Sequence, residues 1–141
     1  AWANAGNSIF LAGPTPRRDD VPSWRVEALR LLEEMSFTGD VFVPEDKGAN
    51  RYADYNGQIN WEWKGLDAAK VIVFWVPRTI ETLPGFTTNV EFGYYANSGR
   101  VVLGYPEGAP KMRYLHAMAD KCEIPTAHSL EQTLRLAIAR L

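Results

Sequence analysis

The sequence is poor in the residues that disulfides and most metal sites need. Its 141 residues include one cysteine, Cys122, and two histidines. A single cysteine excludes a disulfide within the chain, and two histidines argue against a histidine-rich metal site. We therefore expect no metal centre.

Long apolar runs and an excess of positive charge are also missing. No stretch approaches the roughly 18–20 consecutive apolar residues of a membrane-spanning helix, and nothing at the start has the pattern of a signal peptide. Lys and Arg number 15 against 17 Asp and Glu, a formal net charge of -2 at pH 7. Proteins dedicated to nucleic acids normally carry a basic face. We expect a cytoplasmic protein that binds neither a nucleic-acid polymer nor a membrane.

What is present suits a folded domain. Hydrophobic residues make up 46% of the chain and charged residues 23%, enough apolar surface for one core over residues 1–141, with residues 1–6 as a loose arm. Aromatic residues reach 12%, with five tryptophans. They either fill the core or line a pocket for a flat ligand.

Apolar runs and helical periodicities alternate along the chain. Strands are predicted at 7–12, 40–43, 71–76 and 100–105, with a weak one near 125–127. Helices are predicted at 21–35, 59–69, 89–97, from Pro110 onward, and from a capping box at Ser129–Gln132. This alternation predicts an α/β fold with a doubly wound parallel sheet of about five strands, flanked by helices.

Ligands of such sheets bind at the carboxyl ends of the strands. The loops expected there are 13–18, 44–46, 77–86 and 105–108. None of them contains a GxGxxG or Walker A motif, which disfavours a nicotinamide dehydrogenase or an ATPase.

Glu91 follows the strongest predicted strand and is expected in the first turn of a helix. The helix dipole would keep its carboxylate ionised there. Thr88 and Glu91 also have the spacing of a capping box, in which the glutamate only caps its helix.

Glu62 lies between Trp61 and Trp63. Partial desolvation among indoles would raise the pKa of its carboxyl and suit it to donate a proton. The alternative is a solvated glutamate on an amphipathic helix. Together, an ionised and a protonated carboxyl at one sheet edge suit substitution at the anomeric carbon of a sugar, with Glu91 attacking and Glu62 protonating the departing group.

Several segments then look familiar. IFLAGP at 9–14, VPE at 43–45, WE at 61–62, VFWVP at 73–77 and NVEFG at 89–93 together resemble the nucleoside 2-deoxyribosyltransferase-like family, over about Ser8–Tyr105. The resemblance implies a flavodoxin-like (Rossmann-like) domain that transfers 2-deoxyribose between nucleobases through a covalent glycosyl-enzyme intermediate. Related members hydrolyse the N-glycosidic bond of nucleosides or nucleotides. No organic cofactor is implied, and a homo-oligomer is, because the family's sites are completed by an adjacent subunit.

The resemblance also implies roles for particular residues. Glu91 matches the nucleophile, and Glu62 stands where the family usually has an aspartate that assists proton transfer. Phe10 stands where many members have a tyrosine. Gly85 replaces an aspartate that binds the sugar 5'-hydroxyl, a role for which Asn89 or a residue of a neighbouring subunit is a candidate.

Further candidates for binding come from the loops. Arg17 and Arg18 either bind a 5'-phosphate or are a solvated pair. Glu45 and Asp46 are candidates for holding the base or the sugar, and Trp63, Trp75 or Tyr52 for stacking on the base, although Trp75 fits the core better. The predicted substrate-binding residues are Phe10, Gly13, Pro14, Thr15, Arg17, Glu45, Trp63 and Asn89.

Three hypotheses follow from these residues. The first is a deoxyribosyltransferase-like enzyme that exchanges nucleobases through Glu91. The second is a nucleoside or nucleotide N-glycoside hydrolase, in which water is the acceptor. The third is a non-catalytic nucleotide-binding module, in which Glu91 is only a helix cap.

Overall fold

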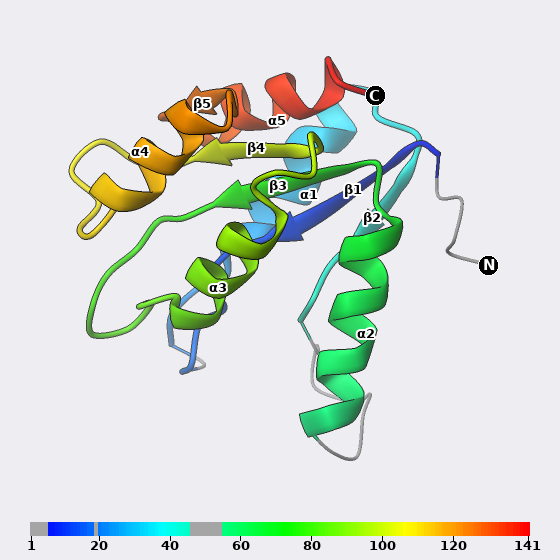
Figure 1. Cartoon of the computed structure of the whole chain (residues 1–141). Helices are drawn as coiled ribbons and strands as arrows, with labels where there is room; N and C mark the ends of the chain where they lie inside the picture. The colour runs from blue at the N-terminus through cyan, green and yellow to red at the C-terminus, as the bar shows by residue number, and fades with distance from the viewer. Residues whose placement is uncertain (1–5, 19, 46–54) are drawn as a thin grey trace.

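Strands and helices alternate along the chain (Figure 1). A computed structural model describes residues 6–18, 20–45 and 55–141. Its strands are β1 (Ser8–Ala12), β2 (Asp40–Phe42), β3 (Val71–Trp75), β4 (Val101–Gly104) and β5 (Thr126–Ala127). Its helices are α1 (Trp24–Glu34), α2 (Tyr55–Ala68), α3 (Phe86–Tyr95), α4 (Arg113–Lys121) and α5 (Leu130–Ile138). Of the residues discussed above, 1–5, Asp46 and Tyr52 lie outside this description.

The strands form one parallel sheet in the order β2-β1-β3-β4-β5. This confirms the predicted doubly wound sheet, and the order is that of flavodoxin-like folds. The strand order reverses between β1 and β3, so the chain leaves these neighbouring strands toward opposite sides. Such a switch point opens a crevice at the carboxyl edge of the sheet.

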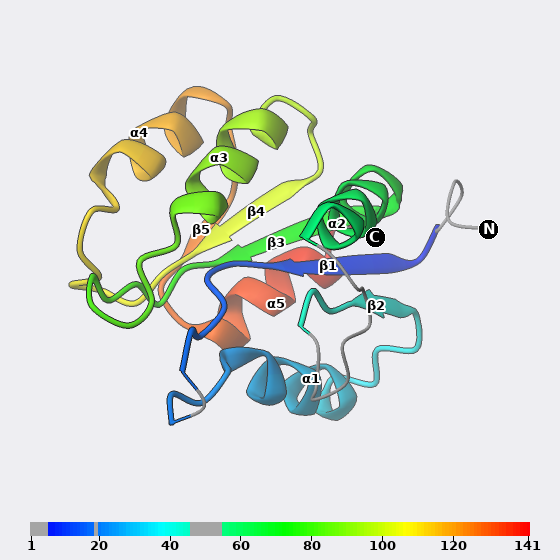
Figure 2. The ribbon, with the colours of Figure 1, turned by 90° about the horizontal axis from the view of Figure 1, so that it is seen from below.

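Helices cover both faces of the sheet. Helices α2, α3 and α4 lie on one face, and α1 and α5 on the other (Figure 2). Successive side chains of a strand point to opposite faces of the sheet. Phe10 and Phe74 therefore pack in the core under α2, α3 and α4, whereas Leu11 and Val73 pack in the core under α1 and α5. Strands β1 and β3 are buried along their whole length, as continuous apolar runs predict.

Helix α5 packs directly on the backbone of β4. A Cβ atom on Gly104 would lie 2.0 Å from Oγ1 of Thr133, so only glycine fits at this contact. Thr133 is buried, and its hydroxyl donates to the carbonyl of Ser129 at 2.7 Å. Ser129 accepts from the backbone N–H of Gln132 at 3.1 Å, which confirms the predicted start of the helix.

Helix α3 starts earlier than predicted, at Phe86 instead of Asn89. Its N-cap is Gly85, in the left-handed conformation at φ 70°, and the N–H of Asn89 already bonds to the carbonyl of Gly85 at 3.2 Å. Glycine adopts this conformation without a steric cost, so the chain turns into the helix directly. Thr88 is therefore not the N-cap, and Glu91 lies in the second turn.

Helix α2 begins at Tyr55, earlier than the predicted start at residue 59. No helix in the described part of the chain has both the length and the apolar character to cross a bilayer.

Candidate active site

Glu62 and Glu91 both line a cleft at the carboxyl edge of β1 and β3. Glu62 belongs to α2, which leads into β3, and Glu91 to α3, which follows it (Figure 1). The cleft has a volume of about 190 Å³. It is lined by Gly13, Pro14, Thr15, Arg17, Gln58, Glu62, Pro84, Gly85, Phe86, Thr87, Thr88 and Glu91. The fold thus brings together the two glutamates that the sequence singled out.

The two carboxyl groups influence each other electrostatically. Burial raises the pKa of Glu91 to about 7, the negative charge of Glu62 adds to this increase, and the positive charge of Arg25 opposes it. Burial also raises the pKa of Glu62, again opposed by Arg25. Protons on interacting carboxyls belong to the pair. With a pKa of about 7, Glu91 takes up and releases a proton near neutral pH.

This corrects one expectation from the sequence. Glu91 was expected to stay ionised at the positive end of a helix dipole, but it lies beyond the first turn, and burial dominates its pKa. The desolvation predicted for Glu62 is confirmed. No side chain caps the start of α3, and the side chain of Glu91 lines the cleft. The capping role for Glu91 is therefore wrong.

The β1–α1 loop forms one wall of the cleft. Gly13, Pro14, Thr15 and Arg17 line it, where the sequence placed substrate-binding residues. The indole N–H of Trp24, the first residue of α1, donates to the carbonyl of Pro14 at 3.0 Å. Helix α1 thereby holds the loop against the edge of the sheet.

Arg25 lies behind the cleft, and the sequence did not point to it. Its side chain is 2% exposed and donates to the carbonyls of Leu11 at 2.9 Å and Gly13 at 2.8 Å. It also donates to the hydroxyl of Thr15 at 2.9 Å and to the carboxylate of Glu45 at 2.6 Å. An available signal was its place just after a serine N-cap, at the carboxyl edge where the loops of β1 and β2 meet.

Glu45 is bound by the protein itself. Its carboxylate accepts from Arg25 and, at 2.5 Å, from the hydroxyl of Ser23, the N-cap of α1. Because these donors occupy Glu45 and it does not line the cleft, its position favours a structural role over contact with the base or the sugar.

Phe10 and Asn89 also lie away from the cleft. Phe10 is 1% exposed, in the core beside Phe42 and Trp61. The amide oxygen of Asn89 accepts a hydrogen bond from the buried Arg78.

Gly85 stands where the family resemblance implied an aspartate in other members. The residue lines the cleft, but its φ of 70° is a conformation in which a Cβ atom is strained. The start of α3 thus favours glycine. The polar side chains that line the cleft without having been predicted are Gln58, Thr87 and Thr88.

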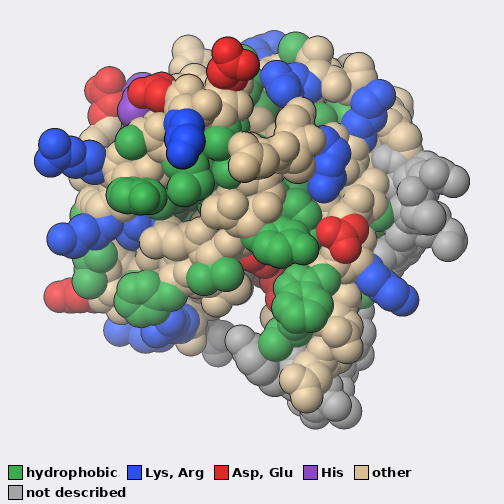
Figure 3. Space-filling model, in the orientation of Figure 1, with side chains coloured by type: hydrophobic (Ala, Val, Ile, Leu, Met, Phe, Trp, Pro, Cys, Tyr) green, Lys and Arg blue, Asp and Glu red, His purple; other side chains and the backbone are tan. Residues whose placement is uncertain are grey.

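Glu91 also borders a second, more apolar hollow. It has a volume of about 310 Å³ and is lined by Trp63, Asp67, Val90, Glu91, Tyr94 and Tyr95. Hydrophobic side chains gather on this side of the molecule, over α2 and α3 (Figure 3). Trp63 is 57% exposed here, whereas Trp75 is buried in the core, as expected.

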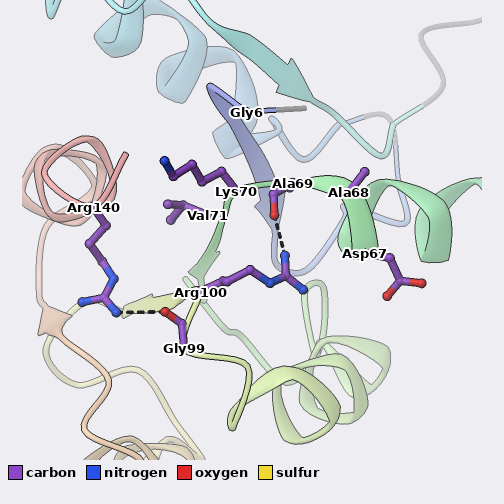
Figure 4. A pocket seen from close by; sticks show the side chains of 9 residues that line it. All are labelled: Gly6, Asp67, Ala68, Ala69, Lys70, Val71, Gly99, Arg100 and Arg140. Carbon is purple, nitrogen blue, oxygen red and sulfur yellow. Dashed lines mark hydrogen bonds between the residues drawn. The ribbon is translucent and has the colours of Figure 1, made fainter. Parts of the chain in front are cut away.

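A larger hollow lies at the opposite, amino edge of the sheet (Figure 4). Arg100 donates to the carbonyls of Leu66 and Ala69 at the end of α2, and Arg140 donates to that of Gly99 at 3.0 Å. These guanidinium groups are thus tied to backbone carbonyls. Within the described ranges, no group of three or more His, Cys, Asp and Glu side chains could hold a metal ion.

Comparison with known proteins finds a family whose match includes the cleft and both glutamates. No curated protein matches the chain. The model of a family described as nucleoside 2-deoxyribosyltransferase like matches residues 6–109, which span β1 to β4 and every residue that lines the cleft. The chain therefore belongs to the nucleoside 2-deoxyribosyltransferase-like family.

Proposed function

We propose that this protein cleaves or transfers at the N-glycosidic bond of a nucleoside or nucleotide, with Glu91 as nucleophile and Glu62 as acid and base. The observation that carries the proposal is the pair itself: two carboxyls from different helices face one cleft, and burial raises the pKa of both. Membership of the family supports a nucleoside-like substrate.

In the first step, an ionised oxygen of Glu91 attacks C1' of the sugar. The C1'–N bond breaks, its electron pair stays on the base nitrogen, and the proton of Glu62 neutralises that nitrogen. The charge developing on the sugar ring is positive, so the negative charge of Glu91 stabilises the transition state. The product is an ester between Glu91 and the sugar.

In the second step, a nitrogen of an acceptor base attacks C1' of this ester. The bond to Glu91 breaks, the Glu91 carboxylate is released, and Glu62 takes the proton of the incoming base. Two displacements at one carbon restore its configuration. This cycle starts with one proton on the pair, carried by Glu62 while Glu91 is ionised.

Hydrolysis of a nucleotide is the alternative that specific residues favour. Arg17 lines the cleft, where a guanidinium can bind a phosphate, and Gly85 supplies no carboxylate to accept a sugar hydroxyl. Water would then attack C1' of the ester in place of a base.

Product analysis separates these reactions. The protein is incubated with a deoxynucleoside or its 5'-monophosphate, with and without a second free base, and the products are separated by chromatography. A new nucleoside or nucleotide indicates transfer, and free sugar or sugar phosphate indicates hydrolysis. Binding without either product indicates the non-catalytic module.

Two variants test the role of Glu91. Glu91→Ala is expected to abolish both reactions, whereas Glu33→Ala, at an exposed position of α1, should keep the wild-type rate. Undiminished turnover by Glu91→Ala would contradict the proposal.

We further propose that the protein is a homo-oligomer through the apolar surface beside the cleft. Exposed apolar side chains gather there: Trp63 is 57% exposed, Phe86 67%, Val90 73% and Tyr94 78%. Such patches commonly mark interfaces. Light scattering should find Val90→Glu dissociated and Tyr114→Glu, at an exposed site on α4, still assembled; a monomeric wild type would contradict the proposal.

A further inference from the structure

Arg25 lies behind the wall of the cleft, not in it. The side chain is buried and is absent from the residues that line the cleft. Its bonds to Leu11, Gly13 and Thr15 all reach the end of β1 or the loop after it. Two of those three residues belong to the segment that forms the wall.

We propose that Arg25 is a positioning residue of the reaction proposed above, on which this inference rests: its guanidinium fixes the β1–α1 loop, and its charge is the buried countercharge of Glu62 and Glu91. Arg25 touches no substrate in this role. It acts through the shape of the wall and through the field inside the cleft.

The first part of the role needs the fork of a guanidinium. Nε bonds to Leu11, one terminal nitrogen to Gly13, and the other to both Thr15 and Glu45. A lysine carries its donors on one nitrogen and cannot reach all four partners in this arrangement. Lysine would therefore keep the charge but release part of the loop.

The second part of the role depends on charge alone. The positive charge of Arg25 lowers the pKa of both Glu62 and Glu91, against the increase caused by burial. Glu45 partly neutralises Arg25 through the ion pair at 2.6 Å. Among the described residues, the charged or titratable groups around the pair are Arg17, Arg25, Glu45, Asp67, Tyr94 and Tyr95. Of these, Arg25 is buried and forms an ion pair with the partly buried Glu45 on the α1 side of the cleft.

Three variants separate the two parts. Arg25→Met removes the charge and the bonds, Arg25→Lys keeps the charge, and Glu45→Gln leaves Arg25 without its neutralising partner. The first readout is the titration of the Glu91 carboxyl in protein labelled with ¹³C-glutamate, assigned with Glu91→Gln. The second is the KM for a deoxynucleoside, or its Kd where turnover is absent.

The charge role predicts shifts of opposite sign. Arg25→Met should raise the pKa of Glu91 by on the order of one unit, because it removes the positive charge that opposes the effect of burial. Glu45→Gln should lower it. Arg25→Lys should leave the titration near that of the wild type while raising KM or Kd several-fold, because the loop is looser.

Shifts of equal sign for Arg25→Met and Glu45→Gln, or no shift in either, would overturn the charge role. An unchanged KM or Kd in Arg25→Lys would overturn the loop role. If Arg25→Met does not fold, Glu45→Gln decides the charge role through its downward shift. The titration needs no turnover, so a protein inactive on every nucleoside refutes the proposed function while the charge role of Arg25 is still tested.

Discussion

The phenol of Tyr95 donates a hydrogen bond of 2.6 Å to the carboxylate of Asp67. Tyr95 ends α3 and Asp67 lies near the end of α2, so this bond joins the two helices that carry Glu91 and Glu62. The guanidinium of Arg100 lies over the ring of Tyr95, 5.7 Å from its centre. The spacing of the paired glutamates is thus braced from the far end of their helices.

Removing this hydroxyl should loosen the brace. Tyr95→Phe is expected to lower the free energy of unfolding by ~1 kcal/mol, the usual cost of one such hydrogen bond. Tyr94→Phe is the matched control, because Tyr94 is 78% exposed, and it should change stability by less than about 0.5 kcal/mol. Urea unfolding of the two variants measures the difference; equal stabilities would show that the bond does not brace the helices.

The shared proton predicts a bell-shaped dependence of kcat/KM on pH. The form with one proton on the pair is the active one, so the rate should fall above about pH 7, where the last proton leaves. It should fall again at lower pH, where both carboxyls are protonated. A rate that keeps rising above pH 7 would mean that ionised Glu91 acts without an acid.

Glu62→Gln tests whether Glu62 is the acid of the pair. The variant removes the negative charge that helps to raise the pKa of Glu91, so Glu91 should ionise below pH 7. Substrates with good leaving groups, such as a nitrophenyl deoxyriboside, should lose less activity than nucleosides, because they need no proton from Glu62.

Burial of Glu91 also predicts a pH-dependent stability. Its pKa is about 7 in the folded chain against an ordinary value of 4.5, so between these values the folded state binds more protons than the unfolded state. Stability contributed by the protonated form is complete below about pH 4.5 and is lost as the pH rises through 7.

Glu91→Gln should remove this loss. Relative to the wild type, the variant is expected to gain about 2 kcal/mol in unfolding free energy between pH 5 and pH 8. Urea unfolding at the two pH values measures the gain. Glu33→Gln, at an exposed glutamate of α1, should show no such gain, and a parallel pH dependence of wild type and Glu91→Gln would contradict the assignment.

Alanine substitutions at Gly85, the N-cap of α3, and at Gly93, inside α3, should change the stability of the fold in opposite directions. Gly85→Ala should destabilise the fold by about 1 kcal/mol, because alanine is strained at a φ of 70°. Gly93→Ala should stabilise it by about 0.5–1 kcal/mol, since a Cβ there meets nothing within 4 Å and the position is helical. Thermal unfolding of both variants tests this pair; destabilisation by Gly93→Ala would mean that the open space beside it is occupied.

The sheet could be predicted from the sequence because its strands are continuous apolar runs. Val71–Trp75 is buried throughout, and such a run between helical periodicities has one place in a parallel sheet. The register of α3 was harder to predict, since Thr88 and Glu91 have the spacing of a capping box. The helix instead starts about one turn earlier, because Gly85 adopts the left-handed conformation and forms its N-cap.

The candidate site was predictable only in part. The β1–α1 loop and Glu91 follow from their place after strands, and Glu62 from its tryptophan neighbours and the family resemblance. All of them line the cleft. Arg25 escaped notice because helical periodicity treats an arginine as a surface residue, whereas its partners are carbonyls of a loop. Asn89 has a polar side chain at the right end of a helix, but Arg78 engages it.

The close packing of α5 on β4 limits where the chain can be truncated for expression. The family match ends at residue 109, yet Leu134 and Ala137 of α5 are fully buried against Val73 and Val102. A fragment that ends at residue 109 would expose the apolar side chains of β3 and β4 that α5 covers. Every residue that lines the cleft would still be present. Expression boundaries drawn from the match alone should therefore yield aggregates, because residues beyond 109 cover one face of the sheet whose edge carries the cleft.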